Sequence, residues 1–157
     1  MRDLTAERYC EKCVTGITVV LAKNVKLYVS AIFDCYDLFV EGISPADHMR
    51  AELCVQTVES ACQSFGEMRG AILHSDRGSR CTSEKFRRSI AGFGIVQSMN
   101  SAGGKCHDNV RCESMWARMK EELFYLRGRK PENFTVDELK TLNSNFLRKL
   151  CQGILTK

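Results

Sequence analysis

The sequence predicts a mixed α/β fold for this chain of 157 residues. Three runs rich in β-branched and aromatic residues follow one another near the N-terminus, joined by short links. After them, segments with helical periodicity alternate with short apolar runs. The expected order is β-β-β-α-β-α-β-α, and a chain of this length can bury one domain's core.

The first three strands are expected at residues 14–21, 25–33 and 38–43. In the second of them, Leu27, Val29, Ala31 and Phe33 alternate with other side chains, as in a half-buried strand. The links between the three strands are short, which predicts an antiparallel meander. Ser44 and Pro45 are expected to end the third strand.

A helix is expected at residues 51–65, followed by a short buried strand at residues 71–74. The helix carries one apolar face at helical spacing, formed by Cys54, Val58, Ala61, Cys62 and Phe65. Ser83 is expected to cap a second helix that ends near residue 91. A fifth strand is expected at residues 95–98.

After a loop at residues 100–107, Asp108 or Asn109 is expected to cap a third helix. Its inward face repeats at helical spacing and comprises Cys112, Met115, Trp116, Met119, Leu123 and Leu126. A neighbouring stripe carries Glu113, Ala117, Lys120 and Phe124. Pro131 is expected to end this element. Thr135 and Glu138 then form a capping box for a last helix with Leu139, Leu142, Phe146 and Leu150 inward.

Composition indicates a soluble globular protein, with 44% hydrophobic and 27% charged residues. No apolar run approaches the ~20 residues that span a bilayer, so no membrane partner is expected. The N-terminus does not begin a signal peptide. Nine cysteines without such a signal favour free thiols in a reducing compartment, and hence a cytoplasmic location.

The charge is distributed unevenly along the chain. Residues 1–76 have a net charge of −4, whereas residues 77–157 have a net charge of +8. The basic half begins directly after Asp76, so an acidic site there borders a basic surface. This arrangement suits a polyanionic substrate, although basic helices are often only solvated surfaces.

Two acidic residues stand in unusual local contexts. Asp76 follows a short apolar run and precedes Arg77 and Gly78, and Glu113 lies in the first turn of a predicted helix. A fold that brings the two carboxylates together creates the beginning of a site for a hard cation, Mg²⁺ or Mn²⁺.

Five spaced blocks occur in order between residues 74 and 114. They are His-Ser-Asp-Arg-Gly-Ser at residues 74–79, Thr-Ser-Glu-Lys-Phe at 82–86, Gly-Ile-Val-Gln-Ser-Met at 94–99, Asp-Asn at 108–109 and Glu-Ser at 113–114. Together they resemble bacterial insertion-sequence transposases, whose catalytic core is of the retroviral-integrase, ribonuclease H-like type. The resemblance implies a ribonuclease H-like fold with a mixed five-stranded sheet, a three-strand antiparallel meander, flanking helices and an extra C-terminal helix.

In the resembled family three carboxylates hold two divalent metal ions for phosphoryl transfer on DNA. The resemblance assigns Asp76 as the second carboxylate and Glu113 as the third. The first belongs to an Asp-Ile-Thr block, which here is Gly16-Ile17-Thr18. Glycine cannot bind metal, so impaired catalysis is expected. The resemblance also implies DNA contacts by Arg77, Lys120 and Arg111.

Two further departures from the family lie near the end of the core. Asp76 and Glu113 are separated by 36 residues, one more than is usual, and the extra residue is expected in the loop around Gly103 and Gly104. After Tyr125 the family pattern is lost. Residues 14–128 are therefore expected to form the integrase-type core, and residues 129–157 a C-terminal helical extension. Residues 1–13 are polar and unpatterned, and are expected to be a flexible lead-in.

Three functional hypotheses follow. The first is a bacterial transposase core that acts on transposon ends and target DNA as a homo-oligomer. The second is a catalytically inactive remnant that binds DNA or a partner. The third is a zinc-stabilised domain, with Cys10 and Cys13 joined by Cys106 and His107 or by Cys112. Replacement of the missing carboxylate by Asp34 or Asp37 is a less favoured alternative.

Overall fold

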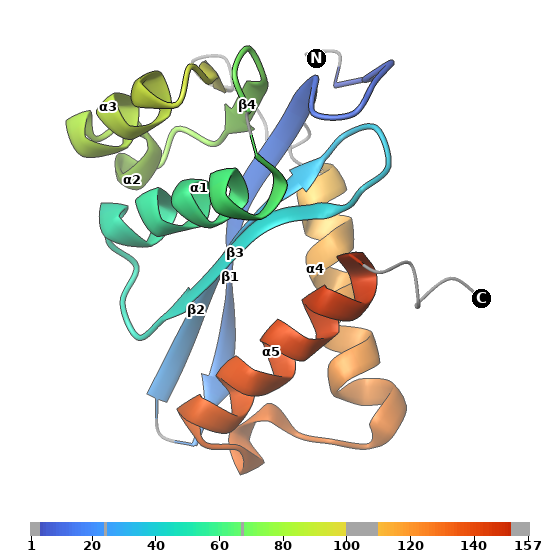
Figure 1. Cartoon of the computed structure of the whole chain (residues 1–157). Helices are drawn as coiled ribbons and strands as arrows, with labels where there is room; N and C mark the ends of the chain where they lie inside the picture. The colour runs from blue at the N-terminus through green and yellow to red at the C-terminus, as the bar shows by residue number, and fades with distance from the viewer. Residues whose placement is uncertain (1–3, 24, 67, 100–109, 152–157) are drawn as a thin grey trace.

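The computed structural model describes residues 4–23, 25–66, 68–99 and 110–151, although not the side chains of residues 65 and 147–151. Its centre is a five-stranded sheet in the order β3-β2-β1-β4-β5 (Figure 1). The strands are β1 Lys12–Ala22, β2 Val25–Asp34, β3 Val40–Ala46, β4 Ile72–Ser75 and β5 Val96–Met99. The first three pair antiparallel, whereas β4 runs parallel to both β1 and β5. The predicted mixed sheet and meander are confirmed.

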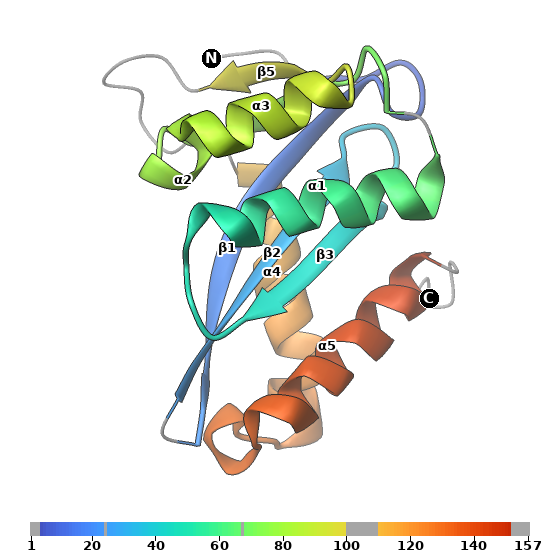
Figure 2. The ribbon, with the colours of Figure 1, turned by 60° about the vertical axis from the view of Figure 1, so that its left-hand side comes forward.

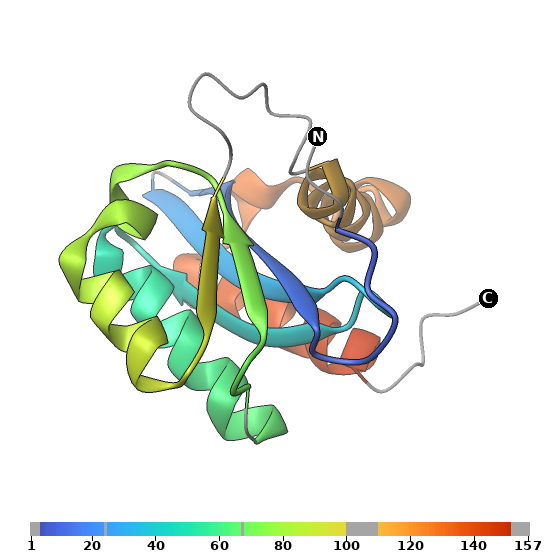
Figure 3. The same cartoon turned by 90° about the horizontal axis from the view of Figure 1, so that it is seen from above.

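Helices cover both faces of this sheet (Figure 3). They are α1 Ala51–Phe65, α2 Ser79–Thr82, α3 Glu84–Gly92, α4 Val110–Leu123 and α5 Val136–Cys151, with the short 3-10 helices η2 Tyr125–Arg127 and η3 Pro131–Asn133 between α4 and α5. One apolar cluster joins α4 and α5 to the sheet, and a second joins α1 and α3 to its other face. The sheet therefore separates two cores.

Alternation along β1 decides which side chains meet each helix layer. Val14 and Val20 belong to the core beneath α4 and α5, whereas Cys13 belongs to the core beneath α1. Side chains at even positions of β1 therefore point toward α4. The β1–β2 hairpin extends beyond the rest of the sheet (Figure 2), because β4 pairs only with residues 12–14 of β1.

Two sequence-based boundaries were wrong. The third strand begins at Val40 and continues through Ser44 and Pro45, which pairs with Val29. A proline is tolerated there because β3 is an edge strand and needs to donate fewer hydrogen bonds. Leu38 instead lies in the preceding turn with a positive φ of 64°.

The end of α4 also differs from the prediction. The helix stops at Leu123, so Leu126 lies in η2 and is 72% exposed, whereas Phe124 is buried. The expected cap at Asp108 or Asn109 lies outside the described residues, as does the side chain of Leu150. The Ser83 cap is confirmed, since its Oγ accepts a hydrogen bond from the Phe86 N–H at 3.2 Å.

The capping box of α5 is confirmed as well. The Thr135 N–H donates to Glu138 Oε2 at 2.8 Å, and the Glu138 N–H donates to Thr135 Oγ1 at 3.3 Å. Inside the helix, Leu139 and Phe146 are buried and Leu142 packs against the same cluster. This reciprocal pair satisfies two N–H groups at the start of the helix.

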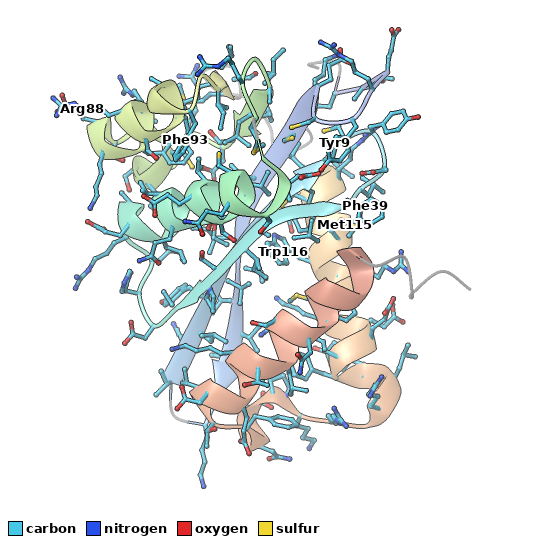
Figure 4. The ribbon with its side chains drawn as sticks, viewed as in Figure 1. Tyr9, Phe39, Arg88, Phe93, Met115 and Trp116 are labelled. Carbon is cyan, nitrogen blue, oxygen red and sulfur yellow. The ribbon has the colours of Figure 1, made fainter. Side chains whose placement is uncertain are left out.

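Two buried carboxylates tie the N-terminal turn to the sheet. Asp34 accepts hydrogen bonds from the backbone N–H groups of Cys10, at 2.6 Å, and Tyr36, at 2.8 Å. Glu41 accepts a hydrogen bond from the Tyr9 hydroxyl at 2.8 Å, and its other oxygen is buried without a partner in the described structure. Figure 4 labels Tyr9 at this end of the sheet. The chain is thus anchored to β2 and β3 before β1 begins.

Replacing Glu41 with glutamine is expected to stabilise the protein at pH 8 more than at pH 5. Burial, with Asp34 and Asp37 nearby, raises the pKa of Glu41 to about 7, against the opposing hydrogen bond from Tyr9. The folded state then holds a proton that the unfolded state releases, so wild-type stability falls as the pH rises through this window. The variant lacks this loss, which is on the order of 2–3 kcal/mol. Urea unfolding at both pH values measures it.

The matched control is Glu59→Gln, which removes an exposed carboxylate from α1. Its effect on the free energy of unfolding should be nearly the same at pH 5 and pH 8. An equal pH dependence of wild type and Glu41→Gln would contradict the assignment of a buried, protonated Glu41.

Candidate metal and DNA site

Gly16 and Asp76 both follow the last paired residues of β1 and β4. Val14 is the β1 partner of His74 in the parallel pairing, and Gly16 and Asp76 each follow two residues later. Val14 points toward α4, whereas Leu73, the neighbour of His74, belongs to the core on the opposite face. By alternation, positions 16 and 76 both lie on the α4 side.

Local hydrogen bonds orient the Asp76 turn. Asp76 is exposed just beyond the end of β4, and its Oδ1 accepts a hydrogen bond from the Gly78 N–H at 2.9 Å. A Cβ on residue 78 would lie 2.9 Å from the same oxygen, so glycine leaves room for the carboxylate. Below it, His74 is fully buried, and its Nδ1 lies 3.1 Å from Ser98 Oγ on β5.

Glu113 lies in the first turn of α4, beside the helix's buried stripe. Cys112, Met115, Trp116, Met119 and Leu123 are buried, while Glu113 is exposed. Trp116 meets Phe33 of β2 edge to face, with ring centroids 5.2 Å apart at 76°. Figure 4 labels Met115 and Trp116 on α4. This packing fixes the helix on the sheet and so fixes where Glu113 stands.

Electrostatics place both carboxylates near one thiol. Burial and the neighbouring Glu113 raise the pKa of Cys112 to about 12, and the charge of Asp76 shifts it in the same direction. The Asp76 charge also adds to the raised pKa of Cys81 in α2, where hydrogen bonding by Cys54 and burial are the larger causes. Asp76 therefore lies within electrostatic range of Cys81 in α2 and of Cys112 in α4.

This arrangement has two oxygen-bearing side chains for a hard cation. Mg²⁺ is commonly held by one or two carboxylates, with water and substrate phosphates completing its coordination. Asp76 and Glu113, the two predicted ligands, carry oxygen atoms of this type. No group of three candidate ligands occurs among the described residues. Among the described residues, a site for two metal ions therefore lacks a third carboxylate ligand.

Asp34 lies on the wrong face of the sheet to supply the missing ligand. It pairs with Cys13, three residues before Gly16, and Cys13 belongs to the core beneath α1. Cross-strand partners share a face, so the Asp34 side chain lies on the opposite side of the sheet from α4. Both of its oxygens already accept backbone hydrogen bonds.

The zinc hypothesis gains no support from the described part of the chain. Cys10, Cys13 and Cys112 are free thiols there, and they form no cluster of three ligands. Cys106 and His107, named as their partners, lie outside the described residues.

The three cationic residues expected to contact DNA are placed differently. Arg77 is exposed beside Asp76. Lys120 lies seven residues after Glu113, about 10 Å further along α4. Arg111 is half-buried, and its Nη1 donates to the Cys35 carbonyl at 2.6 Å. Arg111 thus already anchors the beginning of α4 to the turn after β2.

Lys120 opens onto a groove of about 770 Å³ that sequence reasoning missed. Besides Lys120, the groove is lined by Val19, Val20, Leu21, Phe124, Tyr125, Gly128, Arg129, Lys130, Pro131 and Glu132. The sequence signal for it was the basic run at residues 127–130. That signal lay beyond the limit of the family resemblance, and only the fold places Arg129 and Lys130 beside Lys120.

Comparison with known protein families identifies the domain. The model for the integrase core domain matches residues 7–105. The chain belongs to the integrase core domain family. This finding confirms the resemblance to insertion-sequence transposases and retroviral integrases.

Individual relatives agree with this assignment. The integrase core is 29% identical over 146 residues to the putative transposase InsK for insertion sequence element IS150 of Escherichia coli K12, covering 93% of this chain and 50% of the relative. It is 36% identical over 135 residues to an uncharacterized transposase-like protein of Haemophilus influenzae, and the match covers 85% of this chain and 60% of the relative. The chain thus spans about half the length of these curated relatives.

Solved structures support the fold. The HTLV-2 integrase catalytic core domain in complex with magnesium matches with a TM-score of 0.70 at 15% identity, covering 90% of this integrase core and 86% of the viral one. The ribonuclease H-like fold is therefore confirmed. Among the described residues, no helix combines the length and apolar character needed to cross a bilayer.

Proposed function

We propose that this integrase core binds DNA and carries an incomplete catalytic metal site. Asp76 and Glu113 are its acidic ligands, and Gly16 occupies the place of the first carboxylate. Metal-dependent phosphoryl transfer on transposon ends and target DNA is the ancestral reaction, which this chain performs weakly or not at all. DNA binding itself does not require the missing side chain.

One observation carries this proposal, namely the position of Gly16. Its β2 partner, Ala31, belongs to the cluster beneath α4 and α5, so Gly16 lies on the face that α4 covers. A carboxylate there would face Asp76 and the Glu113 end of the helix. Because glycine supplies no oxygen ligand, a bound ion depends on Asp76, Glu113, water and the DNA phosphates. Affinity for a hard cation falls as charged ligands are removed.

The metal, when bound, would activate an oxygen nucleophile and stabilise the leaving oxygen of a phosphodiester. The chain's own residues position the DNA and hold that ion. Gly78 orients one oxygen of Asp76 through its N–H. The packing of Trp116 on Phe33 holds the helix that carries Glu113.

The proposed DNA surface runs from Arg77 beside the acidic pair, along α4, to the groove at its C-terminal end. Lys120, Arg129 and Lys130 line that groove, and no described side chain forms an ion pair with them. Unpaired cations are available to phosphates. Arg111 contributes to DNA binding through the guanidinium N–H groups that do not contact the Cys35 carbonyl. Assembly as a homo-oligomer is part of the same proposal.

Salt-dependent DNA binding tests this surface. Lys120→Ala is expected to weaken binding of duplex DNA of any sequence and to reduce the slope of log K against log salt by about one. Fluorescence anisotropy of a labelled duplex between 50 and 200 mM salt, a range in which phosphate contacts are strongly attenuated, gives both values.

Lys85→Ala is the matched control, because Lys85 lies in α3 and pairs with Glu52 at 2.8 Å. It should leave affinity and slope unchanged. Equal losses in the two variants would show that binding follows net charge and not the α4 surface.

A further inference from the structure

Cys10 and Cys13 form a pair of thiols at the beginning of β1, and the proposed metal and DNA sites do not use them. Cys13 is fully buried in the strand, and Cys10 is half-buried in the turn before it. Asp34 anchors both positions. It accepts the Cys10 N–H at 2.6 Å and is the β2 partner of Cys13. Asp34 therefore lies next to both cysteine positions.

The thiols are close enough to share a hydrogen bond, in which Cys13 acts as the donor to Cys10. This contact lowers the pKa of Cys10, whereas burial, Glu41 and Asp34 oppose the shift. A thiolate is the nucleophilic form of cysteine. Cys10 is half-buried whereas Cys13 is fully buried, so Cys10 is the member of the pair that a reagent reaches first.

A cavity of about 300 Å³ gives access to Cys10. It is lined by Arg8, Tyr9, Cys10, Glu11, Met68, Arg69 and Gly70. Arg8 is exposed at this cavity. Guanidinium groups bind carboxylates well, so a small compound that carries carboxylates suits the opening.

A second pair of thiols provides an internal comparison. Cys54 and Cys81 also share a hydrogen bond, which lowers the pKa of Cys54. Both residues are buried, at 2% and 6% exposure, and neither lines the cavity at Cys10. The two pairs therefore resemble each other chemically but differ in access.

We propose that Cys10 and Cys13 are a modification site, at which a small anionic disulfide such as glutathione disulfide oxidises the pair to an internal disulfide. The Cys10 thiolate attacks one sulfur of the reagent, forms a mixed disulfide and releases one glutathione thiolate. Cys13 then loses its proton and attacks the Cys10 sulfur, and the second glutathione leaves. The protein loses two hydrogens, and one glutathione disulfide becomes two glutathione molecules.

Thiol mapping by mass spectrometry tests this proposal. The full chain carries Cys106→Ser and Cys151→Ser, because those side chains lie outside the described part, and it retains seven of the nine cysteines. Folded, reduced protein is incubated with glutathione disulfide and then alkylated. Two of the seven thiols should be lost, and the disulfide should map to Cys10 and Cys13, while Cys54 and Cys81 remain alkylatable.

Two variants keep the result decisive. In Cys13→Ser the second step is blocked, so a stable glutathione adduct should accumulate at Cys10. In Cys10→Ser the Cys13 thiol should remain free. Oxidation of the Cys54 and Cys81 pair at the same rate in folded protein would overturn the proposal, and so would recovery of all seven thiols. In urea both pairs should react, which confirms that folding and access control the difference.

Discussion

Gly16→Asp is expected to raise the affinity of the chain for Mn²⁺ by at least about tenfold, since a third carboxylate would join Asp76 and Glu113. Position 16 follows the Val14–His74 pair by two residues and shares the α4 face with Asp76. Calorimetric titration of both proteins measures the change. A strand-transfer assay on a labelled transposon-end duplex measures whether phosphoryl transfer increases with it.

Gly16→Asn is the matched control, because its side chain has nearly the same shape but no charge. Its Mn²⁺ affinity should stay near that of wild type. Glu113→Gln should weaken whatever Mn²⁺ binding the wild type has, which tests the site even if the variants at position 16 fold poorly. Equal affinities in wild type, Gly16→Asp and Glu113→Gln would remove the basis of the proposed metal site.

Gly42→Ala is expected to lower the free energy of unfolding by about 3 kcal/mol, by forcing α1 away from β3. A Cβ at position 42 would lie 2.5 Å from the Thr57 carbonyl oxygen and 2.7 Å from the Ala61 backbone nitrogen. Both atoms belong to the helix backbone, so no side-chain rotation can relieve the contact. Urea unfolding at neutral pH measures the loss.

Gly92→Ala is the control for this substitution. Gly92 ends α3, and a Cβ added there would have open space around it, with no neighbouring atom within 4 Å. The variant should change stability by less than about 1 kcal/mol, with any gain coming from helix propensity. A similar loss at both positions would show that the close approach of α1 to β3 is not what requires glycine at position 42.

Local patterns predicted most of the secondary structure. The apolar face at helical spacing gave α1 its bounds of Ala51–Phe65, and the Thr135–Glu138 pair correctly marked the start of α5. Errors arose where tertiary position overrides local preference. Pro45 stays in a strand because that strand is at the edge, and Leu126 is exposed because α4 ends before its stripe is complete.

The site was predictable only in part, for a physical reason. The residues that carry the acidic motif are local in sequence, whereas their assembly depends on the pairing of β1 with β4, about sixty residues apart. The partly buried Tyr9–Glu41 contact joins residues 32 apart, and no local pattern marks it. The groove at Lys120 likewise depends on how the chain returns after α4.

Crystals of the wild-type chain and of Gly16→Asp, each soaked with Mn²⁺, test the central claim most directly through anomalous scattering. The wild type should show at most one weak peak, between Asp76 and Glu113, and the variant should show stronger occupancy at the same place. Two strong peaks in the wild type would contradict this account, as would a peak at Asp34 and Glu41, because another carboxylate would then have replaced the missing one.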